Sequence, residues 1–72
     1  MRIHGIINDC AEKHGLSANE ITGVNRFSEI VEARWDVIIK ARKFGHTKSA
    51  IGRALNRDHT TIIHACKKMG VA

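Results

Sequence analysis

The chain has 72 residues and no proline, and its 12 lysines and arginines outnumber its 7 aspartates and glutamates to give a net charge of +5. A chain of this length can enclose one small hydrophobic core, which predicts a single domain over residues 1–72 and leaves little room for an enzymatic pocket. The positive charge favours a polyanionic partner, either nucleic acid or an anionic membrane surface.

The first predicted element is an amphipathic helix over residues 2–14. Apolar side chains recur at spacings of three and four from Ile3 to Ala11, and Gly15 follows as a helix stop. This segment lacks the long apolar core and the cleavage site of a signal peptide, and no apolar run of the chain is long enough to span a membrane. We therefore expect a cytoplasmic protein without a membrane partner.

A short helical turn is predicted next. Ser17 precedes Glu20 by three residues, which is the spacing of a capping box, and apolar residues flank the pair as a hydrophobic staple. Gly23 closes this turn. Residues 22–28 then form a loop that contains Arg26.

The longest predicted helix covers residues 28–43 and supplies the centre of the core. Ser28 is expected to be its N-cap. Its broad apolar stripe includes Trp35 and Ile38, and Gly45 breaks the pattern.

Two shorter helices are predicted over residues 47–55 and 58–69. Thr47 and Asp58 are favourable N-caps for them, and Gly70 is the stop of the second. Because so few residues separate the two helices, the pair predicts a helix-turn-helix, whose second helix enters the DNA major groove by its N-terminal end. The inward face of that second helix is expected to comprise Ile62, Ala65, Cys66 and Met69.

The positive charge gathers in the same half of the chain. Residues 1–36 hold four basic and six acidic side chains, whereas residues 37–72 hold eight basic side chains and one acidic one. We therefore expect the binding face in the C-terminal half. The cations expected to neutralise DNA phosphates there are Lys48, Arg53, Arg57, Lys67 and Lys68.

The stretch NRDHTTIIHA, residues 56–65, offers short polar side chains at the start of the last helix. Asp58 can accept a hydrogen bond from a cytosine amino group, and His59 can donate one to purine N7 or O6. The methyl groups of Thr60 and Thr61 can contact a thymine methyl, although two threonines here also suit an ordinary exposed first helical turn. Residue types alone leave both interpretations open.

Metal binding and catalysis find no support in these residues. His59 and His64 lie about 140° apart around a helix, and His64 and Cys66 about 160° apart, so one helix cannot bring them to one ion. The chain also has no glycine-rich phosphate loop and no nucleophile elbow. We expect no metal, no cofactor and no enzymatic activity. Cys10 and Cys66 are expected to be reduced and buried, with a disulfide between them as the alternative.

Residues 49–69, SAIGRALNRDHTTIIHACKKM, closely resemble the signature of the C-terminal DNA-binding domain, domain IV, of the bacterial replication initiator DnaA. The matching positions are Ile51-Gly52, then Arg57 to Thr61, then His64-Ala65. A weaker similarity extends back to about Ile6. The resemblance implies an all-α, Trp-repressor-like helix-turn-helix domain, of the kind that short phage and prophage proteins carry by itself.

The resemblance also implies a role for individual residues. It places base contacts in the major groove at Arg57, Asp58, His59 and Thr60. It places a minor-groove contact at Arg26, where the family usually has several basic residues and where an arginine suits a narrow A·T-rich groove. DNA backbone contacts are implied for Thr61, His64, Lys48 and Arg34, in addition to the cations named above.

These patterns favour a phage or prophage regulator of transcription or replication that binds double-stranded DNA at a site like the DnaA box. The chain has no heptad repeat or long exposed apolar strip, so we expect a monomer on DNA, associated with the nucleoid. The start at Met1 suggests a complete small open reading frame. The positive charges lie on three helices and not on one polar face, which disfavours a membrane-surface binder.

The alternative hypothesis is a protein-interaction adaptor that binds a host initiator or polymerase component. The acidic first half of the chain, together with Val24 and Ile63 as expected exposed apolar side chains, leaves room for this function. A steep dependence of duplex affinity on salt would distinguish DNA binding from it.

Overall fold

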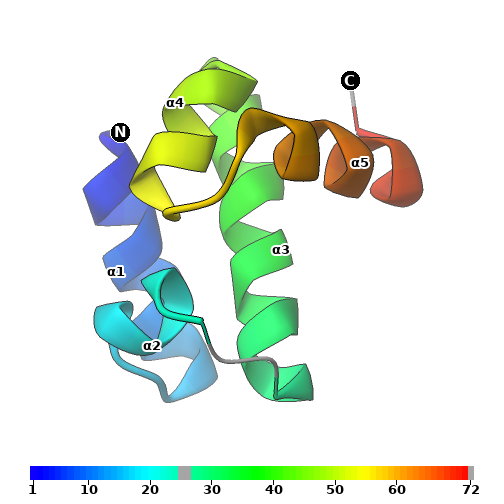
Figure 1. Ribbon diagram of the computed structural model, residues 1–72. Helices are drawn as coiled ribbons and strands as arrows, with labels where there is room; N and C mark the ends of the chain where they lie inside the picture. The colour runs from blue at the N-terminus through cyan, green and yellow to red at the C-terminus, as the bar shows by residue number, and fades with distance from the viewer. Residues whose placement is uncertain (25–26, 72) are drawn as a thin grey trace.

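The computed structural model describes residues 1–24 and 27–71, and this part of the chain forms five helices and no strand. The helices are α1 (Ile3–His14), α2 (Ala18–Thr22), α3 (Ser28–Lys43), α4 (Lys48–Ala54) and α5 (His59–Met69). α3 runs through the middle, with α1 and α2 on one side and α5 across the other (Figure 1). The predicted all-α helix-turn-helix class is confirmed.

Local signals set both ends of α1 and α2. Gly15 adopts a left-handed φ of 68° at the end of α1, and the amide of Leu16 reaches back to the carbonyl of Ala11 at 2.8 Å. Ser17 and Glu20 form the predicted capping box, in which the Ser17 hydroxyl accepts from the Glu20 amide and the Glu20 carboxylate accepts from the Ser17 amide. Both predicted elements are therefore confirmed.

α3 has the predicted bounds, but its N-cap is Phe27 and not Ser28. The Phe27 backbone is extended and its carbonyl accepts from the amides of Ile30 and Val31, so Ser28 already lies in the first turn. The Phe27 side chain makes no capping hydrogen bond to this helix. The prediction that Ser28 is the N-cap was wrong, because the residue that precedes the first helical turn is Phe27.

The inward face of α3 is also rotated from the predicted stripe. Trp35 is only partly buried, whereas Ala33, Val37 and Ala41 are fully buried on the side that faces α1. Small residues on this side let α1 approach closely, and the isoleucines of α1 fill the space between the two helices. The core is completed by Ile51 of α4 and Leu55 directly after it, Ile62 and Cys66 of α5, and Ile21 of α2.

Both cysteines are buried and neither forms a disulfide, as expected. Cys10 lies on the core side of α1, and burial raises the pKa of its thiol. A buried neutral thiol behaves as a small apolar side chain.

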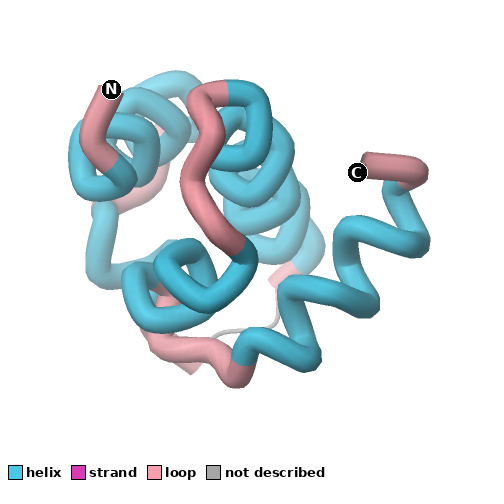
Figure 2. Tube along the Cα trace, turned by 90° about the horizontal axis from the view of Figure 1, so that it is seen from above, coloured by secondary structure: helices cyan, strands magenta, loops and turns pink. Residues whose placement is uncertain are grey.

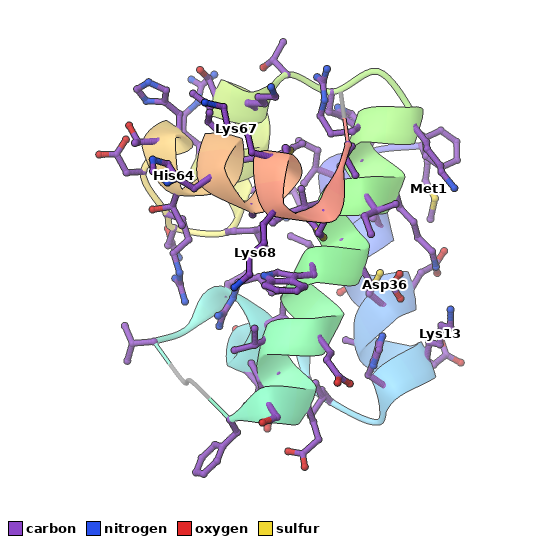
Figure 3. The ribbon with its side chains drawn as sticks, turned by 90° about the vertical axis from the view of Figure 1, so that its right-hand side faces the viewer. Met1, Lys13, Asp36, His64, Lys67 and Lys68 are labelled. Atoms are coloured by element: carbon purple, nitrogen blue, oxygen red, sulfur yellow. The ribbon has the colours of Figure 1, made fainter. Side chains whose placement is uncertain are left out.

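One polar contact joins the rim of α1 to α3. His14 Nε2 lies 3.0 Å from Asp36 Oδ2, and Lys13 Nζ lies 3.7 Å from the same oxygen. The hydrogen bond from His14 lowers the pKa of the Asp36 carboxyl below its ordinary value, and the charge of Lys13 adds to this effect. Lys13 and Asp36 lie on the same side of the molecule in Figure 3.

α4 packs against the turn that precedes α5 at Gly52. A Cβ on this residue would lie 2.8 Å from the carbonyl oxygen of Arg57 and 3.3 Å from the amide nitrogen of His59. The Arg57 amide in turn donates to the Gly52 carbonyl at 2.8 Å. Only glycine permits this approach, so Gly52 sets how closely the two helices of the pair meet.

We predict that Gly52→Ala lowers the free energy of unfolding by about 1–3 kcal/mol, because the added methyl must displace backbone atoms. Urea denaturation measures this change. Gly5→Ala is the matched control, since its Cβ would meet only the Met1 side chain at 3.5 Å, and it should stabilise α1 by about 0.5–1 kcal/mol. Equal stability of the two variants would contradict the packing at Gly52.

We also predict that Asp36→Asn destabilises the domain at neutral pH by about 0.5–1 kcal/mol. The pKa of Asp36 is depressed in the folded state, so its contribution is present above its ordinary pKa of 3.8 and is lost as the pH falls through the folded-state value. Denaturation curves of variant and parent should therefore converge in acid. The exposed Asp9→Asn serves as the control, and a difference between Asp36→Asn and the parent that persists in strong acid would refute the assignment.

Candidate nucleic-acid interface

Each helix of the α4–α5 pair begins with the predicted side-chain cap. Thr47 Oγ1 accepts from the Ala50 amide at 3.1 Å, and Asp58 Oδ1 accepts from the Thr60 amide at 3.3 Å. α5 ends at Gly70, which has a left-handed φ of 70°. Ile62 and Cys66 are buried and Ala65 and Met69 pack against the core, so the predicted inward face of α5 is confirmed.

The first turn of α5 presents four consecutive exposed polar residues, Asp58 to Thr61. Asp58 Oδ1 also lies 3.1 Å from His59 Nδ1, so one carboxylate oxygen caps the helix and orients the imidazole. A neutral imidazole with its proton on Nδ1 offers Nε2 as an acceptor, and an imidazolium offers Nε2 as a donor. The second Asp58 oxygen remains available to accept a hydrogen bond from outside.

The other residues expected at the DNA backbone occupy different surroundings. His64 and Lys67 are exposed on the outer face of α5 (Figure 3). Arg53 is exposed on α4, and Lys48 is partly buried at its start. Lys68 turns away from them and lies with its Nζ 5.6 Å from the centre of the Trp35 ring, a cation–π contact between α5 and α3 (Figure 3).

Contrary to the expected DNA backbone contact, Arg34 does not lie on the surface. Its side chain is 9% exposed, its Nε donates to the carbonyl of Ile21 at 3.0 Å, and its Nη2 donates to that of Gly23 at 3.2 Å. Burial, and then the charge of Arg57, lower the pKa of this guanidinium. A group directed into the domain cannot reach a phosphate, so the predicted backbone contact is corrected to a structural one.

A signal for this role exists in the sequence. Arg34 lies four residues after Ile30 and four before Ile38, both of which are buried, so it shares their helix face. A charged residue at the centre of an inward face needs a buried acceptor. The family resemblance implied a DNA backbone contact for Arg34, and the carbonyls of Ile21 and Gly23 that it binds lie outside its own helix.

Arg57 reaches the same acceptor from the other direction. Its Nη2 donates to the Gly23 carbonyl, and its Nη1 donates to the carbonyls of Leu55 and Asn56 at 3.1 and 3.3 Å. The side chain is therefore partly buried behind the turn and does not stand beside Asp58 at the tip of α5. Two guanidinium groups thus share one carbonyl oxygen, which ties the segment after α2 to the start of α5.

This tie places Gly23, at the end of α2, on the same side of the molecule as the turn before α5. The start of α5 and its end lie far apart in the view from above (Figure 2). Arg26, the expected minor-groove residue, lies outside the described residues. Its described neighbours Val24 and Phe27 are 87% and 70% exposed. Val24 is exposed as predicted, Ile63 is partly buried, and Phe27 is an exposed apolar residue that the sequence analysis did not single out.

Two further observations concern the described part of the chain. No helix within it is long and apolar enough to cross a membrane. It also holds no group of three histidine, cysteine or acidic side chains arranged around a possible metal position. Cys66 is buried while His59 and His64 are exposed, so these three residues point to different surroundings.

Comparison with known proteins bears on the same residues. The family model described as the bacterial dnaA protein helix-turn-helix matches residues 3–69, which include all five helices. The chromosomal replication initiator protein DnaA of Mycoplasma capricolum subsp. capricolum is 39% identical over 61 residues. That alignment covers 82% of this chain and 14% of the initiator, so the chain spans a small part of that relative.

We predict that Arg57→Ala lowers the free energy of unfolding by about 1–3 kcal/mol, because three backbone carbonyls lose a charged donor. Amide NMR spectra of the DNA-free variant should show shifts both after α2 and at the start of α5. Arg57→Lys should recover part of the loss, since an ammonium can still donate to one or two of these oxygens.

Arg53→Ala removes an equivalent charge from the exposed surface of α4 and is the matched control. If Arg57→Ala and Arg53→Ala were equally stable, with shifts confined to residues near each substitution, the tie between the two segments would not exist in solution.

Proposed function

Because this chain belongs to the bacterial DnaA helix-turn-helix family and is therefore a DNA-binding domain, we propose that it recognises a specific double-stranded site that resembles the DnaA box. The observation that carries the proposal is the exposed first turn of α5. It combines the positive end of a helix dipole with three short polar side chains at the place where a recognition helix meets base edges.

Asp58, His59 and Thr60 read bases in this proposal. The 3.1 Å contact between Asp58 Oδ1 and His59 Nδ1 limits the orientations of the imidazole, so the other carboxylate oxygen and Nε2 are presented together as a small pattern of acceptors. Such a pattern selects exposed amino groups of cytosine or adenine in the major groove when His59 is neutral. The methyl group of Thr60 adds an apolar contact for thymine.

The surrounding cations supply affinity without sequence information. Thr61, His64 and Lys67 follow the reading residues along the outer side of α5, and Lys48 and Arg53 extend the basic surface onto α4. Arg26 is proposed to enter the adjacent minor groove. In this proposal Arg57 stabilises the turn before α5, and base contact is made by Asp58, His59 and Thr60. Lys68 stabilises the packing of α5 on α3 through its contact with Trp35.

The proposed biological role is regulation of transcription or replication in a phage or prophage, through occupation of sites that a host initiator also recognises. The similarity to the DNA-binding part of an initiator supports this choice of site. One helix-turn-helix reading an asymmetric site needs no partner copy, so we propose that a monomer binds in the cytoplasm, on the nucleoid.

The experiment that tests the proposal is a selection of the purified chain against randomised duplex DNA at near-physiological salt. Enrichment of a motif like the DnaA box supports the full proposal. Enrichment of an unrelated motif would retain sequence-specific DNA binding and reject the shared site. No enrichment would reject sequence-specific recognition.

We predict that His59→Ala weakens binding to the selected site by about 1–3 kcal/mol and relaxes the preference at only one or two base pairs. Lys67→Ala should instead weaken all sequences alike and reduce the slope of log affinity against log salt by about one. Binding isotherms on the selected site and on single-base variants measure both effects. A uniform loss across sequences for His59→Ala would remove α5 as the reading helix.

A further inference from the structure

A groove lies between α1, α2 and α4, with a volume of about 740 Å³. It is within the size range of clefts that bind ligands or short peptide segments. Its floor is apolar and consists of Ile3, Ile7, Ala18, Ala50 and Ala54. The domain itself leaves this apolar surface uncovered.

The rim of the groove is basic. Arg2 and Arg53 are exposed at it, and His4 and His46 add two imidazoles. His46 Nε2 donates to the carbonyl of Met1 at 2.7 Å, which holds its ring beside the start of α1. Among the residues that the structure describes, no aspartate or glutamate lines the groove, although the first half of the chain is acidic overall. The charges therefore complement an acidic ligand.

The groove and the buried contact with α5 lie on different faces of α4. Ala50, Arg53 and Ala54 face the groove, whereas Ile51 and Leu55 are buried toward the rest of the core and α5. α4 lies between α1 and α5 (Figure 1). A ligand in the groove would thus leave the first turn of α5 exposed.

We infer that this groove binds an acidic amphipathic helix of another protein. Apolar side chains of such a helix cover the alanines and isoleucines of the floor, and its carboxylates reach Arg2 and Arg53 at the rim. A nucleic-acid backbone fits less well, because phosphates gain nothing from an apolar floor. The interaction goes beyond DNA binding and adds a protein partner on a surface that borders the proposed DNA-binding surface at Arg53.

The amide side chains at the rim fit the same ligand. Asn8, Asn19 and Asn56 line the groove and each offers both a donor and an acceptor. They can pair with the polar ends of a docked helix, where backbone amides and carbonyls lack partners. The groove thus supplies apolar, cationic and amide contacts from three different helices and the turn after α4.

The test is an NMR titration of the isotope-labelled full chain with a capped synthetic helix of leucine and glutamate, whose leucines lie along one face. Amide shifts should concentrate at Asn8, Ala18 and Ala50. A peptide with glutamine in place of every glutamate, and one with alanine in place of every leucine, should each bind several-fold more weakly. Shifts centred on residues 58–61, or no saturable binding, would overturn the inference.

Variants of the chain locate the contact. Arg2→Glu should weaken the leucine–glutamate peptide about tenfold, and Ala18→Glu, which puts a carboxylate on the floor, should abolish its binding. Lys43→Glu makes the same change of charge as Arg2→Glu at an exposed position of α3 outside this groove, and should weaken binding far less. Thermal melts confirm that each variant is folded. Equal losses for Arg2→Glu and Lys43→Glu would show diffuse attraction and overturn a specific site.

Discussion

The carbonyl oxygen of Gly23 is the acceptor on which the arrangement of the binding face depends. Arg34 approaches it from α3 and Arg57 from the turn before α5, so three segments that are distant in sequence meet at one atom. Two buried or partly buried cations need acceptors, and the domain offers backbone carbonyls around the end of α2 in place of a carboxylate. The partial negative charge at that helix end suits them. The position of the start of α5 relative to the end of α2 follows from this contact.

The elements of the fold that the sequence predicted are those with local causes. The Ser17 capping box, the Thr47 and Asp58 caps and the Gly15 stop are each decided within about five residues, and all of them occur in the structure. The N-cap of α3 was predicted wrongly because the extended residue before the first helical turn is Phe27 and Ser28 is already helical. The rotation of the inward face of α3 could not be predicted from its own stripe, because packing on α1 and α5 together decides it.

At the candidate interface, too, the sequence predicted features with local causes and missed those that depend on tertiary contacts. The exposure of residues 58–61 follows from their place in the first turn of a helix whose opposite side is apolar, and a pattern reveals this. The engagement of Arg57 with a carbonyl 34 residues away, and of Lys68 with Trp35, depends on tertiary contacts that no local pattern contains. A basic residue near a recognition helix can therefore serve the fold, and the number of cations in a sequence overstates the number available to phosphates.

α4 contributes to two surfaces of this small domain, one against the turn before α5 and one in the groove. Gly52 lets the turn before α5 lie against one side of the helix, while Ala50 and Ala54 leave the opposite side shallow. α4 thus carries small residues on both faces and separates the turn before α5 from the groove. Arg53 lies at the border of the two surfaces, whereas the first turn of α5 lies outside the groove lining. A ligand in the groove therefore leaves the exposed residues 58–61 at the start of α5 uncovered.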